Sequence, residues 1–266
     1  MLWVVQKNLF IENKRHALLD ALDRLDIPFL LVDVHNNNTA PDIPPGSENG
    51  PIITNGSVML SHIAIARNWS PGSLFNENFS YDIWSKFYQD FLLNKNAVFS
   101  TFGLAQPQMD HVFVRPIADT KAFNGQVFSK DEFAQFQRNS LNKIQGFPDP
   151  STPILYAPPK TIGQEHRHYV VDGQVVTSSR YKLAGQPNFH PGADQGIVDI
   201  VQSAIALFQP AQAFVVDTYV SGDDVGIVEI GGICHAGLYE ADLIKLVHAL
   251  DNMTILESAR KNQFKI

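Results

Sequence analysis

Apolar runs and amphipathic stretches alternate in the first third of the chain. The run L-W-V-V at residues 2–5 predicts a strand, and residues 14–25 predict a helix because leucines recur on one of its faces. The run I-P-F-L-L-V-D-V at 27–34 predicts a second strand, and P-I-I-T at 51–54 predicts a third, followed by the strand-to-helix turn N-G-S at 55–57. Strands that alternate with helices pair in parallel, so this order favours an open parallel sheet.

Residues 80–93 carry aromatic side chains at helical spacing. Such a stripe is typical of a helix face packed against a core rather than of a ligand site. We therefore expect a helix here, buried along the stripe formed by Tyr81, Trp84, Phe87, Tyr88 and Phe91.

The pattern changes after Asn96 to short apolar runs, which predict a mostly antiparallel sheet. Within the last run, Asp172-Gly173 is a two-residue hairpin signal. Two segments with helical spacing interrupt the strands, at residues 193–208 and 240–250. The chain is therefore expected to be α+β with an α/β front end. The predicted strands lie at residues 97–102, 111–116, 125–128, 153–157 and 168–181.

Composition narrows the function classes. The 266 residues are 44% hydrophobic, which is ample for a packed core, and the lone Cys234 rules out an internal disulfide framework. A net charge of -7 argues against broad binding of a nucleic-acid backbone, and no apolar run is long enough to span a bilayer. The amino terminus shows no export signal, so we expect a cytoplasmic protein.

An acidic hairpin is predicted at residues 214–230, where the runs F-V-V-D-T-Y-V and V-G-I-V-E-I flank S-G-D-D. If Val220 pairs with Gly226, Asp217 lies opposite Glu229 on the same face. Opposed carboxylates repel unless a cation lies between them, which favours a divalent metal site. The alternative is a register one residue away, with both acids facing water.

A second polar cluster reads Glu165-His166-Arg167-His168. Strand alternation places Glu165 and Arg167 on one face and the two histidines on the other. An acceptor beside a permanent cation could hold a sugar hydroxyl and a phosphate, whereas the alternative is a surface ion pair. We expect the histidine face to be solvated, and we expect Cys234 to be a small buried residue rather than a nucleophile.

Two short motifs stand between the expected strands: V-F-V-R-P at residues 112–116 and T-K-A-F-N-G at residues 120–125. Together with the pieces above, they resemble the ATP-grasp family, and more narrowly its phage- and bacteria-associated clade with arginine in place of the usual phosphate-binding lysine. The resemblance implies that Arg115 and Lys121 reach the ATP phosphates while the loop through Gly125 folds over them.

The resemblance continues along the chain. The run P-I-L-Y-A-P-P at 153–159 is similar to the hinge strand of the family, which hydrogen-bonds adenine through its backbone. The pattern E-x-R…S-x-Y and the two acids of the hairpin also match, which implies catalytic roles for Arg167 and Lys121 and magnesium binding by Asp217 and Glu229. The implied nucleotide-binding residues are Arg115, Lys121, Gly125, Leu155, Tyr156, Ala157, Glu165, Arg167, Ser179 and Tyr181.

The family resemblance also implies a fold and an activity. The expected fold is a small α/β pre-ATP-grasp domain at residues 1–95, followed by two α+β lobes at about 96–160 and 161–266 that clasp ATP. The expected activity is ATP-dependent carboxylate-amine ligation through an acylphosphate, with ATP and Mg²⁺ as cofactors. The partners would be a carboxylate and an amine from an amino acid, peptide or protein, and a homodimer is a further expectation.

One position departs from the family pattern. Gly231 stands two residues after Glu229, where the family usually carries asparagine, so one carbonyl ligand of the metal is missing. Three interpretations follow from the sequence: an active ligase, an ATP-binding protein weakened or silenced at its metal site, and an α+β binding module whose motifs are coincidental.

Overall fold

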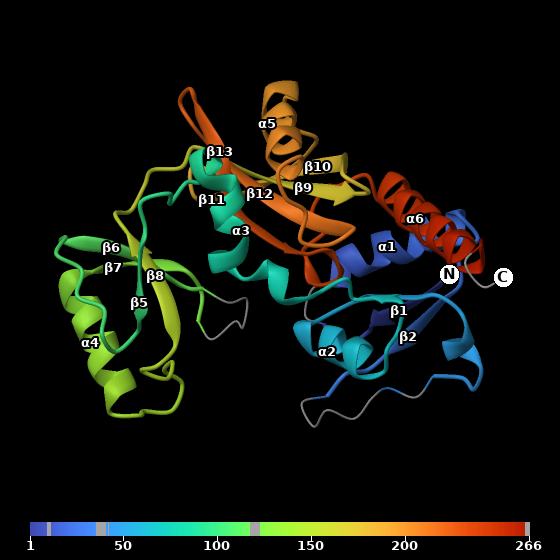
Figure 1. Ribbon diagram of the computed structural model, residues 1–266, viewed down its shortest axis with the longest axis horizontal. Coiled ribbons are helices and arrows are strands. Elements are labelled where there is room, and N and C mark those ends of the chain that lie inside the picture. Colours follow the sequence, from blue (N-terminus) through green and yellow to red (C-terminus); the bar gives the residue numbers. More distant parts are fainter. Residues whose placement is uncertain (10–11, 36–40, 42, 118–122, 264–266) are drawn as a thin grey trace.

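Three sheets form the frame of the protein, whose structure is a computed structural model (Figure 1). The structure describes the chain except for residues 10–11, 36–40, 42, 118–122 and 264–266. Sheet B, built from strands β9 to β13, lies between sheet C (β5 to β8) at one end and sheet A (β1 to β4) at the other (Figure 1). None of the helices in the described part of the chain combines the length and apolar character that crossing a bilayer requires.

Sheet A confirms the predicted parallel front end. Its order is β2-β1-β3-β4, and every pair of neighbours is parallel. The predicted turn before the second helix is present, because the Ser57 side chain caps that helix by accepting from the backbone N–H of Leu60. The elements are β1 (Leu2–Gln6), α1 (Glu12–Arg24), β2 (Phe29–Val32), η1 (Ser47–Asn49), β3 (Ile52–Asn55), α2 (Val58–Ala66) and β4 (Pro71–Gly72).

Sheet C is antiparallel and carries a helix that the pattern did not reveal. Only two helices were expected beyond residue 96, and this prediction is wrong because α4 (Lys130–Leu141) follows β7 directly. A capping box between Ser129 and Glu132 starts α4, and Phe133 anchors it in the core. The strands are β5 (Val98–Thr101), β6 (His111–Pro116), β7 (Gln126–Ser129) and β8 (Pro153–Ala157), in the order β5-β8-β6-β7.

Sheet B is antiparallel with the order β11-β10-β9-β12-β13. Asp172 and Gly173 form the predicted tight hairpin, both with positive φ of 48° and 72°. The edge strand β11 was not predicted, and α6 runs beyond the expected end at residue 250. The elements are β9 (Gln164–Val171), β10 (Gln174–Leu183), β11 (Gln186–Pro191), α5 (Gln195–Ile205), β12 (Ala213–Ser221), β13 (Asp224–Gly232), η4 (Ile233–His235) and α6 (Leu243–Gln263).

Sheet B is buried on both faces, and each face has its own core. On one face Tyr169 and Val215 pack with Trp3 of sheet A and Val247 of α6. On the other face Val216 packs with residues of α5 and α3, including Trp84. The predicted aromatic helix is therefore present as α3 (Tyr81–Tyr88), flanked by η2 (Glu77–Phe79) and η3 (Gln89–Phe91).

The segment before residue 95 contributes to both of these cores, although the predicted boundary falls in the gap between η3 and β5. The division into residues 1–95 and 96–266 stays a prediction.

Candidate active site

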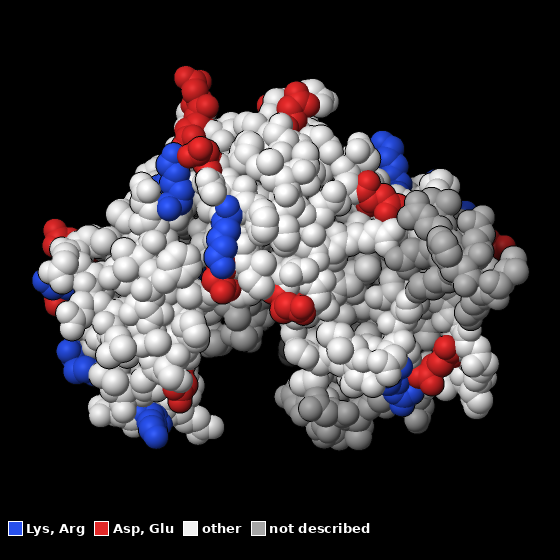
Figure 2. Space-filling model, viewed as in Figure 1, with Lys and Arg blue, Asp and Glu red and all other residues white. Residues whose placement is uncertain are grey.

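A cleft of about 520 Å³ opens between sheets B and C. Its sheet C wall includes Arg115 and Gly125, and its sheet B wall includes Glu165, Arg167 and Tyr181. Lys and Arg lie interspersed with Asp and Glu on the face shown in Figure 2, so the surface there is of mixed charge. The polar groups that matter are gathered inside the cleft.

Four predicted residues form one row across sheet B. Ser179 of β10 pairs with Arg167 of β9, Arg167 pairs with Asp217 of β12, and Asp217 pairs with Glu229 of β13. Residues opposite one another in an antiparallel ladder share a face. The predicted opposition of Asp217 and Glu229 is therefore confirmed.

The pairing from which this opposition was inferred is wrong. Val220 pairs with Val225 rather than with Gly226, so the hairpin turn is one residue tighter than assumed. A bulge between Asp217 and Thr218 then inserts Val228 into β13 and restores the opposition of the two acids. The site geometry thus depends on a bulge that alternation alone does not predict.

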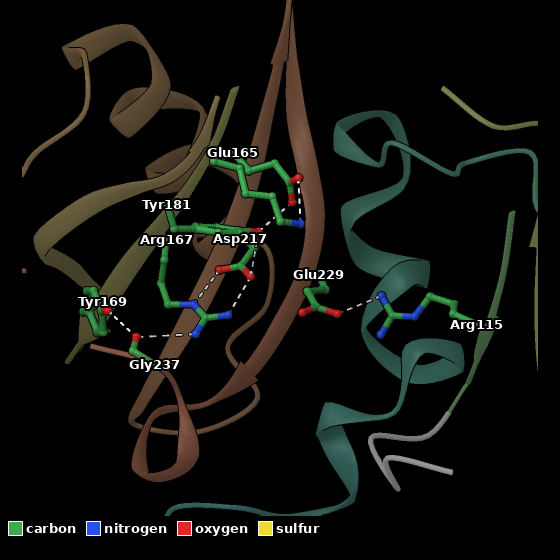
Figure 3. Close-up of polar contacts among 9 residues, drawn as sticks. Arg115, Glu165, Arg167, Tyr169, Tyr181, Asp217, Glu229 and Gly237 are labelled. Carbon is green, nitrogen blue, oxygen red and sulfur yellow. Dashed lines mark hydrogen bonds and ion pairs between the residues drawn. The ribbon is translucent and has the colours of Figure 1, made fainter. Parts of the chain in front are cut away.

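Arg167 and Asp217 form a buried bidentate ion pair (Figure 3). The guanidinium Nε donates to Oδ1 at 2.8 Å and Nη2 donates to Oδ2 at 2.7 Å, while Nη1 donates to the carbonyl of Gly237 at 3.4 Å. The Tyr169 hydroxyl donates to the same carbonyl at 2.6 Å. Burial alone would lower the pKa of Arg167, but Asp217 outweighs burial and raises it well above its usual value. Arg167 is therefore a fixed cation.

Glu165 belongs to a neighbouring group of polar side chains. Its Oε2 accepts from the Tyr181 hydroxyl at 2.7 Å, and its Oε1 lies 3.0 Å from Nζ of Lys182. Burial, Asp217 and Glu165 together raise the pKa of Tyr181, so its hydroxyl stays a donor. The alternative of an ion pair between Glu165 and Arg167 does not hold, because each has a different partner. Lys182 was missed by the sequence analysis, although it follows Tyr181 directly.

Arg115 reaches across the cleft from sheet C. Its Nη1 lies 3.0 Å from Oε2 of Glu229, and its guanidinium lies over the Tyr81 ring with 5.7 Å to the centroid (Figure 3). Gly125 lies against the same arginine, since a Cβ placed on Gly125 would be 3.1 Å from the Cβ of Arg115. Lys121, the other predicted phosphate ligand, lies outside the described residues.

Not all of the predicted nucleotide-binding residues line the cleft. Leu155 and Ala157 of β8 are buried, and the residues of the chain that line the cleft at this point are Pro158 to Lys160. Tyr156 packs against the apolar cluster of sheet C.

Ser179 is also turned away from the cleft lining. It is fully buried, and its Oγ lies 3.2 Å from the carbonyl of His190 and accepts from the N–H of Glu240 at 3.1 Å.

The histidines of β9 are buried, so the predicted solvated face is wrong. His168 lies between hydroxyls, with Ser178 Oγ at 2.8 Å and Thr218 Oγ1 at 2.9 Å, and His166 is 4% exposed. Burial, aided by His166, lowers the pKa of His168 to about 3. The cause of the difference is that α5 and α3 pack on this face of sheet B.

Cys234 is a small buried residue, as predicted. Burial raises the pKa of its thiol to about 12, so the nucleophilic thiolate is disfavoured.

The donor set of the cleft fits a magnesium ion that takes further oxygens from phosphates. Asp217 and Glu229 are carboxylates on one face, and magnesium is commonly held by one or two carboxylates plus substrate phosphates. No larger group of three or more His, Cys, Asp or Glu gathers anywhere among the described residues. Gly231 faces Val215 across the ladder and adds no side-chain oxygen.

A family model for an ATP-grasp domain, described as family 3 of its clade, matches residues 71–250. The chain belongs to the ATP-grasp family. This ATP-grasp protein therefore has the fold implied by the sequence, with mixed helices and sheets. No curated protein sequence matches it.

Solved structures share the fold of this ATP-grasp protein at low identity. D-cycloserine synthetase DcsG has a TM-score of 0.64 at 12% identity, with 95% of this chain and 100% of that chain covered. A D-alanine–D-alanine ligase from Bacillus anthracis has a TM-score of 0.60 at 12% identity, with 99% of each chain covered. The ATP-grasp ligase PsnB, solved with a minimal precursor, has a TM-score of 0.59 at 12% identity, with 95% of this chain and 98% of that chain covered.

Proposed function

We propose that this ATP-grasp protein is an ATP-dependent ligase that joins a carboxylate to an amine through an acylphosphate. The observation that carries the proposal is the pairing of Arg115 with Glu229 and of Arg167 with Asp217 within one cleft. Two cations suited to phosphates and two carboxylates suited to magnesium thus lie together. The similar structures named above include ligases of amino acids and a ligase bound to a precursor, which supports this reaction class.

The residues of the cleft divide into roles. Arg115, Arg167 and Lys182 supply positive charge for the phosphates, and the family resemblance adds Lys121. Asp217 and Glu229 would hold Mg²⁺, and the resemblance assigns Gly125 to the loop above the phosphates. Bound Mg²⁺ would neutralise charge on the transferred phosphate.

The adenine contacts are proposed at the end of β8. β8 is an interior strand paired with both β5 and β6 at Leu155 and Tyr156, so the backbone groups of these residues take part in ladders. Ala157 is paired with β6 alone, and the residues after it line the cleft. We therefore place adenine against Ala157 and the following Pro158 to Lys160, one step beyond the residues implied by the resemblance.

The chemistry requires no protein nucleophile. A carboxylate oxygen of the substrate attacks the γ-phosphorus, the bond to the bridging oxygen breaks, and ADP leaves. The amine then attacks the acyl carbon, loses a proton, and phosphate leaves. Carboxylate and polyphosphate repel one another, so the role of Arg167 is to hold a permanent positive charge where they meet. Tyr181 and Glu165 hold the neighbouring polar wall in place.

The second candidate is an ATP-binding protein with a weakened metal site. The observation in its favour is Gly231, which leaves one metal ligand of the family pattern missing. A screen of ATP consumption against amino acids, peptides and cell extract separates the two candidates. Turnover stimulated by a carboxylate and an amine together supports the ligase, whereas nucleotide binding without stimulated turnover by any of them supports the second candidate.

Location and assembly are proposed from the sequence. We propose a cytoplasmic protein that forms a homodimer, to be checked by cell fractionation and by light scattering. A monomer at the concentrations used for the assays would contradict the homodimer.

A further inference from the structure

Three aromatic rings stack in a row that leads out of the cleft. Tyr181 of β10 stacks on Tyr239 with centroids 5.0 Å apart and planes 10° apart, and Tyr239 stacks on Phe189 of β11 at 5.6 Å and 17°. Tyr181 is 8% exposed, whereas Phe189 is 52% exposed. The row therefore begins in the polar wall of the cleft and ends at the surface of the protein.

The position of Tyr239 is fixed by its loop. Its φ is +46°, a conformation that bulky side chains rarely adopt and that persists only where surrounding contacts hold it. Gly237 makes room for the ring, because a Cβ there would lie 3.1 Å from it. The loop is also anchored on β10, where Ser179 Oγ accepts from Glu240 and Thr177 Oγ1 accepts from Asp242.

The stack borders the cation of the reaction centre. The guanidinium of Arg167 lies 5.1 Å from the Tyr239 centroid and 5.7 Å from that of Tyr181. Asp217 and Gly237 accept three hydrogen bonds from Arg167, and a guanidinium has five N–H donors. Two donors thus remain for a substrate carboxylate, which matches this cation in charge and in planar geometry.

The distance from Arg167 to Phe189 decides the size of the substrate. A carboxylate at Arg167 is separated from Phe189 by the full width of the Tyr239 ring and its two stacking gaps. That path corresponds to about three residues of extended chain at roughly 3.3 Å each. A free amino acid held at Arg167 is too short to contact Phe189.

We infer that Tyr239 and Phe189 form a subsite for a peptide that carries the reacting carboxylate, with an aromatic side chain of that peptide against Phe189. The inference rests on the proposed function, because it names the carboxylate substrate of the same cleft. Aromatic rings gain from stacking beyond the burial of their area, which gives Phe189 a reason to be aromatic although it is half exposed.

The test compares two pools of N-acetylated tripeptides with free carboxyl termini and randomised second and third residues. The first residue is Phe in one pool and Gly in the other, and free amino acids form a third sample. Binding is followed by saturation-transfer NMR with and without Mg²⁺ and a non-hydrolysable ATP analogue. Hydroxylamine then replaces the amine, so that an acylphosphate is captured as a hydroxamate and phosphate is released.

We expect the Phe pool to bind roughly tenfold more tightly than the Gly pool and to give more hydroxamate. The Phe189→Ala variant should lose this preference and keep its affinity for the nucleotide. Phe87→Ala is the matched control, because Phe87 is 45% exposed and also stacks, on Phe208 at 4.4 Å, outside the cleft. It should behave as the wild type.

Several outcomes overturn the inference: equal binding of the two pools, free amino acids binding as tightly as the Phe pool, or equal effects of Phe189→Ala and Phe87→Ala. A loss of nucleotide affinity in Phe189→Ala would also overturn it, since the stack would then hold adenine. Failure of the ATP analogue to bind the wild type contradicts the proposed function instead. Preference for the Phe pool without nucleotide would still support the subsite.

Discussion

Arg115 and Glu229 meet across the cleft with 3.0 Å between Nη1 and Oε2, although one lies on β6 of sheet C and the other on β13 of sheet B. The Glu229 side chain is 37% exposed, and ion pairs open to solvent contribute less than about 1 kcal/mol. A phosphate that takes the place of Glu229 at Arg115 therefore costs little stability. The pair positions both groups for a ligand without locking them together.

The first prediction concerns Arg115. Arg115→Ala should weaken binding of magnesium ATP about tenfold or more, because a charge-assisted contact with phosphate is lost. The free energy of unfolding should change by less than about 1 kcal/mol. Calorimetric titration with a non-hydrolysable analogue measures the first quantity and urea unfolding the second. The same weakening is expected for Lys121→Ala from the family resemblance.

Arg67→Ala is the control for Arg115, because Arg67 also forms a solvent-accessible ion pair, with Glu48 at 2.7 Å, but does not line the cleft. Its nucleotide affinity should equal that of the wild type. Equal affinities for all of these variants would show that the phosphate assignment is wrong.

The two acids should differ sharply in their effect on stability. Asp217 is 2% exposed and neutralises Arg167, so Asp217→Asn leaves a buried cation without its partner and should destabilise the protein by about 3 to 5 kcal/mol. Glu229→Gln removes only the more exposed pair and should cost less than about 1 kcal/mol. Urea unfolding of both variants checks the difference. Metal-dependent turnover should be lost in both, because each removes one of the two carboxylates.

Similar destabilisation by the two substitutions would contradict the assigned partners. The comparison is informative because both changes are isosteric and remove one negative charge. A loss of turnover in Glu229→Gln alone would assign the metal to Glu229 and leave Asp217 as the residue that positions Arg167.

The sequence predicted the opposition of Asp217 and Glu229 but could not predict how it arises. Alternation gives the face of each residue once a pairing is chosen, yet the chosen pairing of Val220 was one residue off and the bulge at Val228 corrected it. Bulges are set by the packing and twist of neighbouring strands. A pattern read along one strand does not contain that information.

The errors on β9 and α4 have different physical causes. His166 and His168 follow the polar alternation of a solvated strand, but helices from distant parts of the chain cover them, and hydroxyls of Ser178 and Thr218 satisfy the ring of His168. Burial of this kind is tertiary. The helix α4, by contrast, announces itself through Ser129 and Glu132 of its capping box, so local sequence could have predicted it.

The buried histidine should make stability depend on pH. Its pKa of about 3 in the folded state lies below the ordinary value of 6.5, so between these values the unfolded chain binds a proton that the folded protein does not. Stability should therefore fall as the pH drops below 6.5, by up to about 1.4 kcal/mol per pH unit from His168. The lowered pKa of His166 acts in the same direction.

Urea unfolding at neutral pH and about one unit below pH 6.5 measures this dependence in the wild type and in His168→Gln. Glutamine does not titrate, so the slope of stability against pH should be smaller in the variant. His248→Gln is the control, since His248 lies on the exposed side of α6, and its slope should match the wild type. An unchanged slope in His168→Gln would mean that His168 is protonated in the folded protein.

The last prediction tests the missing metal ligand. Gly231 lies two residues beyond Glu229 on β13, hence on the same face, where an asparagine amide oxygen could reach the cation. The position tolerates a side chain, because a Cβ there meets only Val215 at 3.4 Å. If the protein is an active ligase, its metal site is already complete, and Gly231→Asn should leave ATP turnover unchanged or lower it by crowding. Gly231→Ala is the control, because it adds a side chain without an oxygen. Steady-state turnover and manganese affinity are measured for both variants. A clear gain in turnover and metal affinity for Gly231→Asn, absent in Gly231→Ala, would favour the weakened ATP-binding protein over the active ligase.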